Sequence, residues 1–269
     1  MNAVIVFDAD NTLWDTNGVF RRAQLDLLGV FARAGLCADA ESQLRVLRRI
    51  DREFADRIGS FEYDFRLLPA ALACHYTLGL TITEAVEKIV SQTYQNGDPR
   101  LAAIVDESYR AFAEGLRKIP SLYPDAWAVI SSIRSSRSSE NRIVTVIFSE
   151  GAPERLERVF EAHEIRGRGL FDEIIIGAKS RAAFEAAKRA GLKHLSSEGE
   201  AHETLFIMVG DSLQRDIKFG NQTGYTTVYI PAGFLGREKP REPDEEPHYI
   251  VERLSELPPI LRALGLTCS

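Results

Sequence analysis

Five short apolar runs, separated by stretches with helical spacing, constrain the fold of this chain more than any other feature. The runs cover residues 4–7, 143–148, 171–177, 205–209 and 226–230. Each is rich in β-branched or aromatic residues and is bounded by turn residues, which predicts a buried strand. Because parallel strands need helical crossovers, the alternation predicts an α/β fold, a doubly wound parallel sheet with helices on both faces.

Residues 19–118 interrupt this alternation with a block that has helical spacing throughout. Within the block, Thr81 and Glu84 have the spacing of a capping box at the start of a helix. We therefore expect a core domain formed by residues 1–18 and 119–269, and an all-helical domain inserted between the first and second strands.

The helix ends are predicted from glycines, prolines and capping residues. The first helix of the block is expected to begin at Val19, after a polar turn, and Asp98 is expected to cap a later helix that a proline opens. The helix after the third run is expected to end at Gly191, and a short helix after the fourth run to end near Gly220. A strand fragment and a helix are expected within residues 249–264.

The composition is that of an ordinary globular chain. Its 269 residues, 45% of them hydrophobic, are enough for a large domain with a smaller one. A net charge of -6 provides no basic surface for a nucleic-acid backbone, so no nucleic-acid partner is expected. The three cysteines, Cys37, Cys74 and Cys268, are widely spaced, which indicates neither a disulfide framework nor a thiolate metal site. No apolar run reaches the roughly 18 residues of a membrane span. We expect a cytoplasmic protein without membrane contact, and the sequence leaves its oligomeric state open.

Each of the first four runs is followed by a polar residue that is useful in phosphate chemistry. These residues are Asp8, Ser149, Lys179 and Asp211. The carboxyl ends of parallel strands face the ligand crevice of an open sheet, so the four side chains are expected to meet there. Taken singly, each has a plain structural explanation as a turn residue, a helix cap or a solvated surface charge. Their recurrence at four strand ends favours a shared site.

The chemistry expected at this site is phosphoryl transfer to Asp8. A carboxylate can attack phosphorus and form an aspartyl phosphate if nearby negative charge is neutralised. Asp8 and Asp211 offer the hard oxygen ligands that Mg²⁺ takes. Lys179 would offset negative charge, and Ser149 would hydrogen-bond the transferred group. Asp10 would protonate the leaving alcohol and then take a proton from the attacking water.

The segment from Asp8 to Thr12, with the sequence Asp-Ala-Asp-Asn-Thr, resembles motif I of the haloacid dehalogenase (HAD) superfamily, DxDxT/V. Ser149 resembles the hydroxyl residue of motif II, and Lys179 resembles the lysine of motif III. Residues 210–216 resemble the GDSxxxD form of motif IV. The chain is thus similar, over nearly all of its predicted core, to HAD hydrolases of the phosphatase type.

This resemblance implies a Rossmann-like core with a helical cap of type C1, here residues 19–118. It also implies Mg²⁺ as cofactor, held by the carboxylates of Asp8 and Asp211 and by the backbone carbonyl of Asp10. Two further residues of motif IV would support the metal ligands or the lysine: Ser212 and Asp216. The residues that the resemblance assigns to substrate binding are Thr12, Ser149, Glu150, Gly151 and Lys179.

Two residues depart from the family pattern. Glu150 stands where Asn is more usual, and Ser180 stands where Pro is common. An additional carboxylate would repel a phosphate unless it points away or meets a cationic group, so Glu150 leaves the substrate class open. Helical arginines are mostly solvated surface charges, but the block offers four candidates for binding a second anionic group: Arg21, Arg22, Arg66 and His75.

The leading hypothesis is magnesium-dependent hydrolysis of a small phosphate monoester. Dehalogenases of the same superfamily lack the second aspartate because no leaving alcohol needs a proton, so Asp10 argues against that chemistry. A phosphomutase would share the same core and cap. A hydrolase releases phosphate and a phosphomutase forms an isomer of its substrate, and only this difference in product separates the two enzymes. A non-enzymatic receiver-like phosphoacceptor is a weaker alternative, because its acceptor would follow the third strand.

Overall fold

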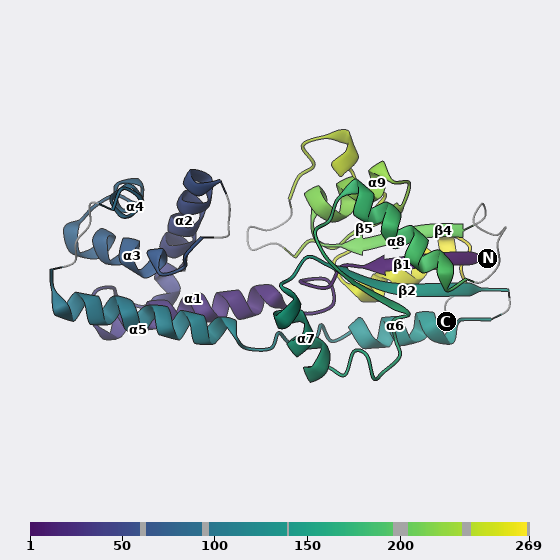
Figure 1. Ribbon diagram of the computed structural model, residues 1–269, viewed down its shortest axis with the longest axis horizontal. Helices are drawn as coiled ribbons and strands as arrows, with labels where there is room; N and C mark the ends of the chain where they lie inside the picture. The colour runs from purple at the N-terminus through teal and green to yellow at the C-terminus, as the bar shows by residue number, and fades with distance from the viewer. Residues whose placement is uncertain (60–62, 93–96, 139, 196–203, 233–237, 268–269) are drawn as a thin grey trace. The chain divides into compact units, whose positions relative to one another are not determined.

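The structure is a computed structural model that describes residues 1–59, 63–92, 97–138, 140–195, 204–232 and 238–267. The chain divides into two compact units (Figure 1). The core unit comprises Met1–Asn17 and Ile119–Ser269, and the helical unit comprises Gly18–Lys118. The sequence also predicts loops at residues 131–142 and 233–247, and parts of both, together with Cys268, lie outside the described residues.

The described part of the core unit contains a parallel sheet of six strands in the order β3-β2-β1-β4-β5-β6. The strands are β1 (Asn2–Phe7), β2 (Arg142–Ser149), β3 (Glu173–Ile176), β4 (Thr204–Gly210), β5 (Thr226–Tyr229) and β6 (Tyr249–Ile250). The predicted α/β fold is confirmed, and the expected fragment at residue 249 supplies the sixth strand. Phe7 lies opposite both Ile147 and Val209, so β1 ends beside β2 and β4. The strand order reverses between β1 and β4, where open α/β sheets bind ligands.

Helices cover both faces of the sheet (Figure 1). Ala3, Ile5 and Phe7 of β1 belong to one hydrophobic cluster, and Val4 and Val6 belong to another. The first cluster includes residues of α6 (Ala126–Ser135), α7 (Pro153–Ala162) and α10 (Leu257–Ala263), and the second includes residues of α8 (Arg181–Lys193) and α9 (Lys218–Gln222). Because β1 is buried on both sides, its sequence is continuously apolar rather than alternating.

The helical unit packs its helices around a separate hydrophobic core. The helices with residues in this unit are α1 (Thr16–Arg33), α2 (Ala40–Ile58), α3 (Leu67–Leu78), α4 (Ile82–Val90) and α5 (Pro99–Leu116). The predicted capping box of Thr81 and Glu84 is confirmed at the start of α4. Asp98 accepts a hydrogen bond from the backbone N–H of Arg100 and caps α5, as predicted. Among the described residues, no helix combines the length and the apolar character of a membrane span.

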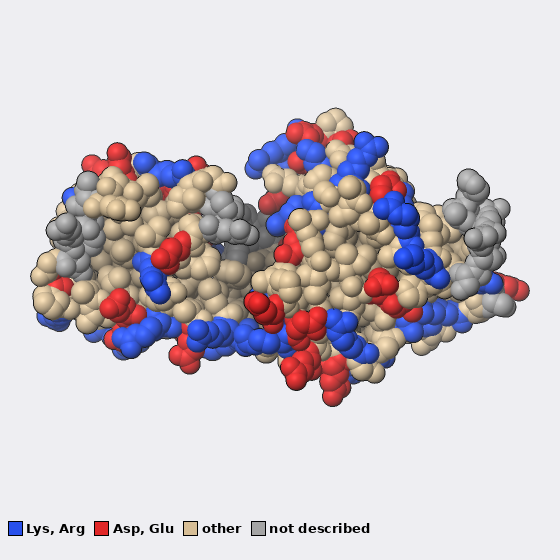
Figure 2. Space-filling model, in the orientation of Figure 1, with Lys and Arg blue, Asp and Glu red and all other residues tan. Residues whose placement is uncertain are grey.

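Charged side chains of both signs are interspersed over the face of the core unit seen in Figure 2. Surface ion pairs of this unit join Arg166 to Glu157 and Lys218 to Glu242. Pairs of this kind contribute little to stability because water screens them. The expected absence of a nucleic-acid partner stays a prediction.

The first helix begins earlier than predicted. α1 starts at Thr16 rather than at Val19, because the polar turn after β1 also caps the helix. The side-chain oxygen of Asn11 accepts a hydrogen bond from the backbone N–H of Asn17 at 2.8 Å, and the Thr16 hydroxyl donates to Asp10. The turn thereby satisfies a backbone donor in the first turn of α1.

Two glycines that were expected to end helices lie inside them instead. Gly191 lies within α8, and a Cβ atom added there would come within 2.5 Å of Val4 Cγ1. Gly220 lies within α9, and a Cβ atom there would come within 2.8 Å of Thr227 Cγ2. The two helices end two residues beyond these glycines, at Lys193 and Gln222, because the glycines serve close contact between helix and sheet rather than a left-handed helix terminus.

Replacing Gly191 with alanine tests this packing. Alanine favours a helix over glycine by roughly 1 kcal/mol, but its Cβ would overlap Val4, a stiff β-branched side chain. We expect Gly191→Ala to lower the free energy of unfolding by roughly 1–3 kcal/mol in urea denaturation. Gly29→Ala is the matched control, since its nearest neighbour is Arg33 Nη1 at 3.5 Å, and it should stabilise by up to about 1 kcal/mol. Stabilisation by both substitutions would contradict the packing role.

Candidate active site

A pocket of about 200 Å³ lies at the carboxyl ends of β1, β2 and β4. Its lining includes every predicted site residue except Thr12: Asp8, Asp10, Ser149, Glu150, Gly151, Lys179, Asp211, Ser212 and Asp216. Thr12 is buried, and its hydroxyl donates to Asp8 Oδ2 at 3.3 Å. Ser149 is buried at the end of β2, and its hydroxyl accepts a hydrogen bond from the backbone N–H of Gly151 at 3.3 Å. Residues far apart in sequence therefore meet at one rim.

Lys179 forms two buried ion pairs in this pocket. Its Nζ donates to Asp8 and, at 2.6 Å, to Asp216. The three side chains are almost inaccessible to water, with 3%, 6% and 0% of the surface of Lys179, Asp8 and Asp216 exposed. Burial lowers the pKa of Lys179, but the two carboxylates outweigh burial and raise the pKa above its usual value. The lysine therefore stays charged and orients Asp8.

The carboxylates of the pocket outnumber this ammonium. Burial raises the pKa of Asp8 to about 7; the charge of Lys179 opposes this shift, and the charges of Asp216 and Asp10 add to it. Burial, together with the charges of Asp8 and Asp216, raises the pKa of Asp211 well above its usual value. Negative charge in this pocket thus lacks sufficient compensation from the protein.

The donor set fits a divalent cation. Asp8, Asp211 and Asp216 each offer a carboxylate oxygen, and these oxygens lie within 4.8 Å of one another. Both oxygens of Asp216 already accept hydrogen bonds, one from Lys179 Nζ and one from the backbone N–H of Ser212 at 2.9 Å. Asp8 and Asp211 are therefore the better placed ligands for Mg²⁺, which prefers oxygen. A divalent cation there would also lower the two raised pKa values.

The turn after β4 brings Asp216 back to the end of the strand. Residues Leu213–Ile217 form one wide π-helical turn, whereas the sequence suggested a short α-helix at this point. A Cβ atom added at Gly210 would come within 2.4 Å of the Asp216 carboxyl group. Gly210 is therefore required for the packing of this carboxylate as well as for the turn.

Asp10 is held by four hydrogen bonds. Oδ1 accepts from Trp14 Nε1 at 2.9 Å, from Arg155 Nη1 at 2.9 Å and from the Thr16 hydroxyl. Oδ2 accepts from Arg155 Nη2, so the guanidinium is bidentate. Burial raises the pKa of Asp10, but the hydrogen bonds and charge of Arg155, with the Thr16 and Trp14 hydrogen bonds, bring the pKa below its usual value.

The two residues that depart from the family pattern, Glu150 and Ser180, both form hydrogen bonds with nearby backbone groups. Glu150 Oε1 accepts a hydrogen bond from the backbone N–H of Lys179 at 2.6 Å, and Oε2 lies 3.3 Å from Arg215 Nη1. Ser180 caps α8, since its hydroxyl accepts from the backbone N–H of Ala183 at 3.2 Å. The positive charge of Arg215 reduces the repulsion that Glu150 would exert on a phosphate.

Three residues of the site were absent from the sequence-based prediction: Asn11, Arg155 and Arg215. Asn11 has a positive φ of 61°, and its side chain hydrogen-bonds to Asp211 and opposes the rise in pKa that burial causes in that group. Arg155 is the third residue of α7, where a basic side chain opposes the helix dipole, and this unfavourable position is the signal that could have identified it. Arg215 carries no comparable signal.

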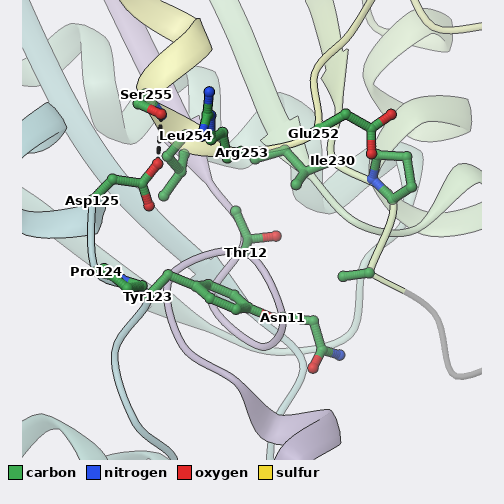
Figure 3. Close-up of a pocket in the computed structure, with 12 residues that line it drawn as sticks. Asn11, Thr12, Tyr123, Pro124, Asp125, Ile230, Glu252, Arg253, Leu254 and Ser255 are labelled. Atoms are coloured by element: carbon green, nitrogen blue, oxygen red, sulfur yellow. Dashed lines mark hydrogen bonds between the residues drawn. The ribbon is translucent and has the colours of Figure 1, made fainter.

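A second cavity, of about 400 Å³, borders the pocket at Asn11 (Figure 3). Figure 3 shows Tyr123 beside Asn11 and Thr12, and it shows the hydrogen bond of 2.7 Å from the backbone N–H of Ser255 to Asp125. Thr12, predicted to bind substrate, lines this cavity and not the pocket. Its contact with the substrate stays a prediction, whereas its hydrogen bond supports Asp8.

The candidates for a second anion site lie in the helical unit. The guanidinium carbon of Arg66 lies 5.2 Å from the ring centroid of Tyr109. His75 Nδ1 lies 2.6 Å from the backbone carbonyl oxygen of Leu80, at the end of α3. The other two candidates are exposed residues of α1: Arg21 and Arg22. A role for these four residues in substrate binding stays a prediction.

Comparisons with known proteins point to one family. Residues 175–257 match the HAD-hydrolase-like family model. The chain is also 24% identical over 268 residues to the glyceraldehyde 3-phosphate phosphatase of Methanopyrus kandleri, a match that covers 98% of this chain and 99% of that protein. The similarity therefore extends through both units.

Solved structures have the same fold. A haloacid dehalogenase-like hydrolase from Xanthomonas campestris, 18% identical, has a TM-score of 0.58, with 98% of this chain and 91% of that chain covered. The HAD hydrolase YfnB from Bacillus subtilis, solved with magnesium, is 19% identical and has a TM-score of 0.54, with 97% and 98% covered. The family match and the phosphatase relative together support a hydrolase of the haloacid dehalogenase superfamily, and the solved structures show that the chain has the corresponding fold.

Proposed function

We propose that this chain is a magnesium-dependent phosphomonoester hydrolase that acts on a small phosphorylated metabolite. The observation that carries the proposal is the buried ammonium of Lys179 between Asp8 and Asp216, beside another carboxylate, Asp211. The relative from Methanopyrus kandleri is named a glyceraldehyde 3-phosphate phosphatase, which supports a small phosphate ester as the substrate.

Asp8 is the proposed nucleophile. A bond forms from one carboxylate oxygen to phosphorus while the bond from phosphorus to the leaving alcohol breaks, which yields an aspartyl phosphate. Lys179 occupies Oδ1, whereas the hydrogen bond from Thr12 to Oδ2 is long at 3.3 Å, so Oδ2 has more freedom to attack. The ammonium also offsets charge on the phosphoryl oxygens.

Asp10 is the proposed acid and base. It gives a proton to the leaving oxygen and then takes a proton from the water that attacks the aspartyl phosphate, which releases phosphate and restores Asp8. The hydroxyl of Ser149 and the backbone N–H groups near the start of α7 would hydrogen-bond the phosphoryl oxygens. Asp8, Asp211 and the backbone carbonyl of Asp10 would hold Mg²⁺, which supplies positive charge beside the transferred group.

The size of the pocket supports a small substrate. Its volume of about 200 Å³ is smaller than the roughly 300–1,000 Å³ of pockets that hold drug-sized ligands, which favours a small ester. We also propose that residues 19–118 act as a cap that contacts the substrate and excludes water, with residues 1–18 and 119–269 as the catalytic core.

Asp8→Asn tests the nucleophile. The purified protein should release phosphate from a panel of small phosphate monoesters that includes glyceraldehyde 3-phosphate, with Mg²⁺ present and not with EDTA. Asparagine keeps the shape of the side chain but is a poor nucleophile, so kcat should fall at least about a thousandfold. Retained turnover would exclude Asp8 as nucleophile, and isomer formation without phosphate release would favour the phosphomutase.

Asp211→Asn tests the metal site. Loss of a charged ligand should raise the Mg²⁺ concentration for half-maximal activity by more than about tenfold. The measurement is phosphate release across a Mg²⁺ titration. Asp125→Asn, in the neighbouring cavity, is the control and should leave that concentration unchanged. An unchanged Mg²⁺ requirement in the Asp211 variant would remove this residue from the proposed ligand set.

Asp10→Asn tests proton transfer. The kcat/KM for an alkyl phosphate should fall by about 10²–10⁴-fold, since the alkoxide needs a proton to leave. For p-nitrophenyl phosphate, whose phenolate leaves without a proton, the fall should be much smaller. The Mg²⁺ requirement should stay near that of the wild type, because only the backbone carbonyl is a proposed ligand. A variant that cannot use Mg²⁺ would contradict this division of roles.

A further inference from the structure

We propose that Arg155 is a positioning residue for Asp10, and that its guanidinium restricts proton transfer in the reaction to one carboxylate oxygen, Oδ2. This inference rests on the proposed function, in which Asp10 is the acid and base. Arg155 lies outside the pocket lining, so it would act through Asp10 and not through the substrate.

The hydrogen bonds distinguish the two oxygens of Asp10. Oδ1 accepts three hydrogen bonds, from Trp14, Thr16 and Arg155. It has only two lone pairs, so its capacity to accept is already filled. Oδ2 accepts only the one bond, from Arg155 Nη2, among those of the described residues. Oδ2 is therefore the oxygen that retains a lone pair for a proton.

The position of Arg155 in the chain favours this pairing. The residue occupies the first turn of α7, where a cation is repelled by the helix dipole unless an anion compensates it. Its guanidinium passes close to Gly151, where an added Cβ atom would come within 2.4 Å of Nη2. The side chains of Arg155 and Asp10 are 33% and 23% exposed, so water screens the pair less than it screens a surface pair. Bidentate geometry fixes both the distance and the plane of the carboxylate.

The proton balance of the reaction uses the same oxygen twice. In the first step the O–H bond at Oδ2, which the second step of the preceding turnover formed, breaks as the P–O bond of the ester breaks, and the leaving alkoxide becomes an alcohol. The carboxylate that results is stabilised by Arg155. In the second step a water molecule gives its proton to Oδ2 while its oxygen attacks the phosphorus of the aspartyl phosphate. A small displacement of Asp10 would therefore slow both steps.

The experiment compares two substrates in the full-length protein with Mg²⁺. One is an alkyl phosphate, glyceraldehyde 3-phosphate or the best alkyl ester of the panel, and the other is p-nitrophenyl phosphate. The kcat/KM reports steps up to the first irreversible one, here the transfer to Asp8, so a loss confined to the alkyl ester identifies defective protonation of the leaving group.

Arg155→Met should lower kcat/KM for the alkyl ester by about 10–100-fold, and for p-nitrophenyl phosphate by less than about threefold. Arg155→Lys, which keeps the charge but not the bidentate geometry, should recover only part of the loss. Adding Arg155→Met to Asp10→Asn should produce little further loss, because both changes act on one step. Arg158→Met, an exposed arginine of the same helix, is the control and should behave as the wild type.

Two results would overturn the positioning role. Equal losses for both substrates, which leave the ratio of the two kcat/KM values unaltered, would assign Arg155 a purely structural role, and no loss for either substrate would exclude any role in protonation. These failures are separable from failure of the proposed function. If the wild type hydrolyses neither ester, the proposed function is wrong; if Asp10→Asn is selective for the alkyl ester and Arg155→Met is not, only the role of Arg155 is wrong.

Discussion

The buried ammonium of Lys179 between two carboxylates is the interaction on which the rest of the site depends. Removing three charges from water is costly, and a pair that loses one partner leaves an uncompensated buried charge. The three groups follow three different strands, β1, β3 and β4. They meet because β1 pairs in register with both β2 and β4, and β2 carries β3 on its other side. Strand order therefore decides whether this cluster exists.

Around this cluster, two further carboxylates have arginine partners. Glu150 lies beside Arg215, and Asp10 is clamped by Arg155. These pairs confine the uncompensated negative charge to Asp8 and Asp211, whose pKa values are raised. A site with this distribution attracts a divalent cation to one place and keeps the neighbouring carboxylates oriented. The departure at Glu150 is thus accommodated by the opposite charge of Arg215 nearby.

The local signals in the sequence predicted the strands and several helix ends, but they could not distinguish two uses of glycine. Gly59 ends α2 with a φ of 76°, the left-handed conformation that glycine favours at a helix terminus. Gly191 has the same local appearance, yet it lies inside α8, where its missing side chain admits Val4. The choice depends on what packs against the residue, and that neighbour is distant in sequence. The early start of α1 had a similar cause, since the cap comes from the turn after β1.

By itself, the sequence determined the order of strands and helices, the insertion after the first strand, and the identity of the polar residue that follows each strand. These properties are local, because they depend on side-chain periodicity and on turn chemistry within a few residues. Only the tertiary structure decided which charges became partners, as for Asp10 with Arg155 and Glu150 with Arg215. An ion pair requires a separation of a few ångströms between atoms, and packing of the helices against the sheet sets that separation for residues far apart in the chain.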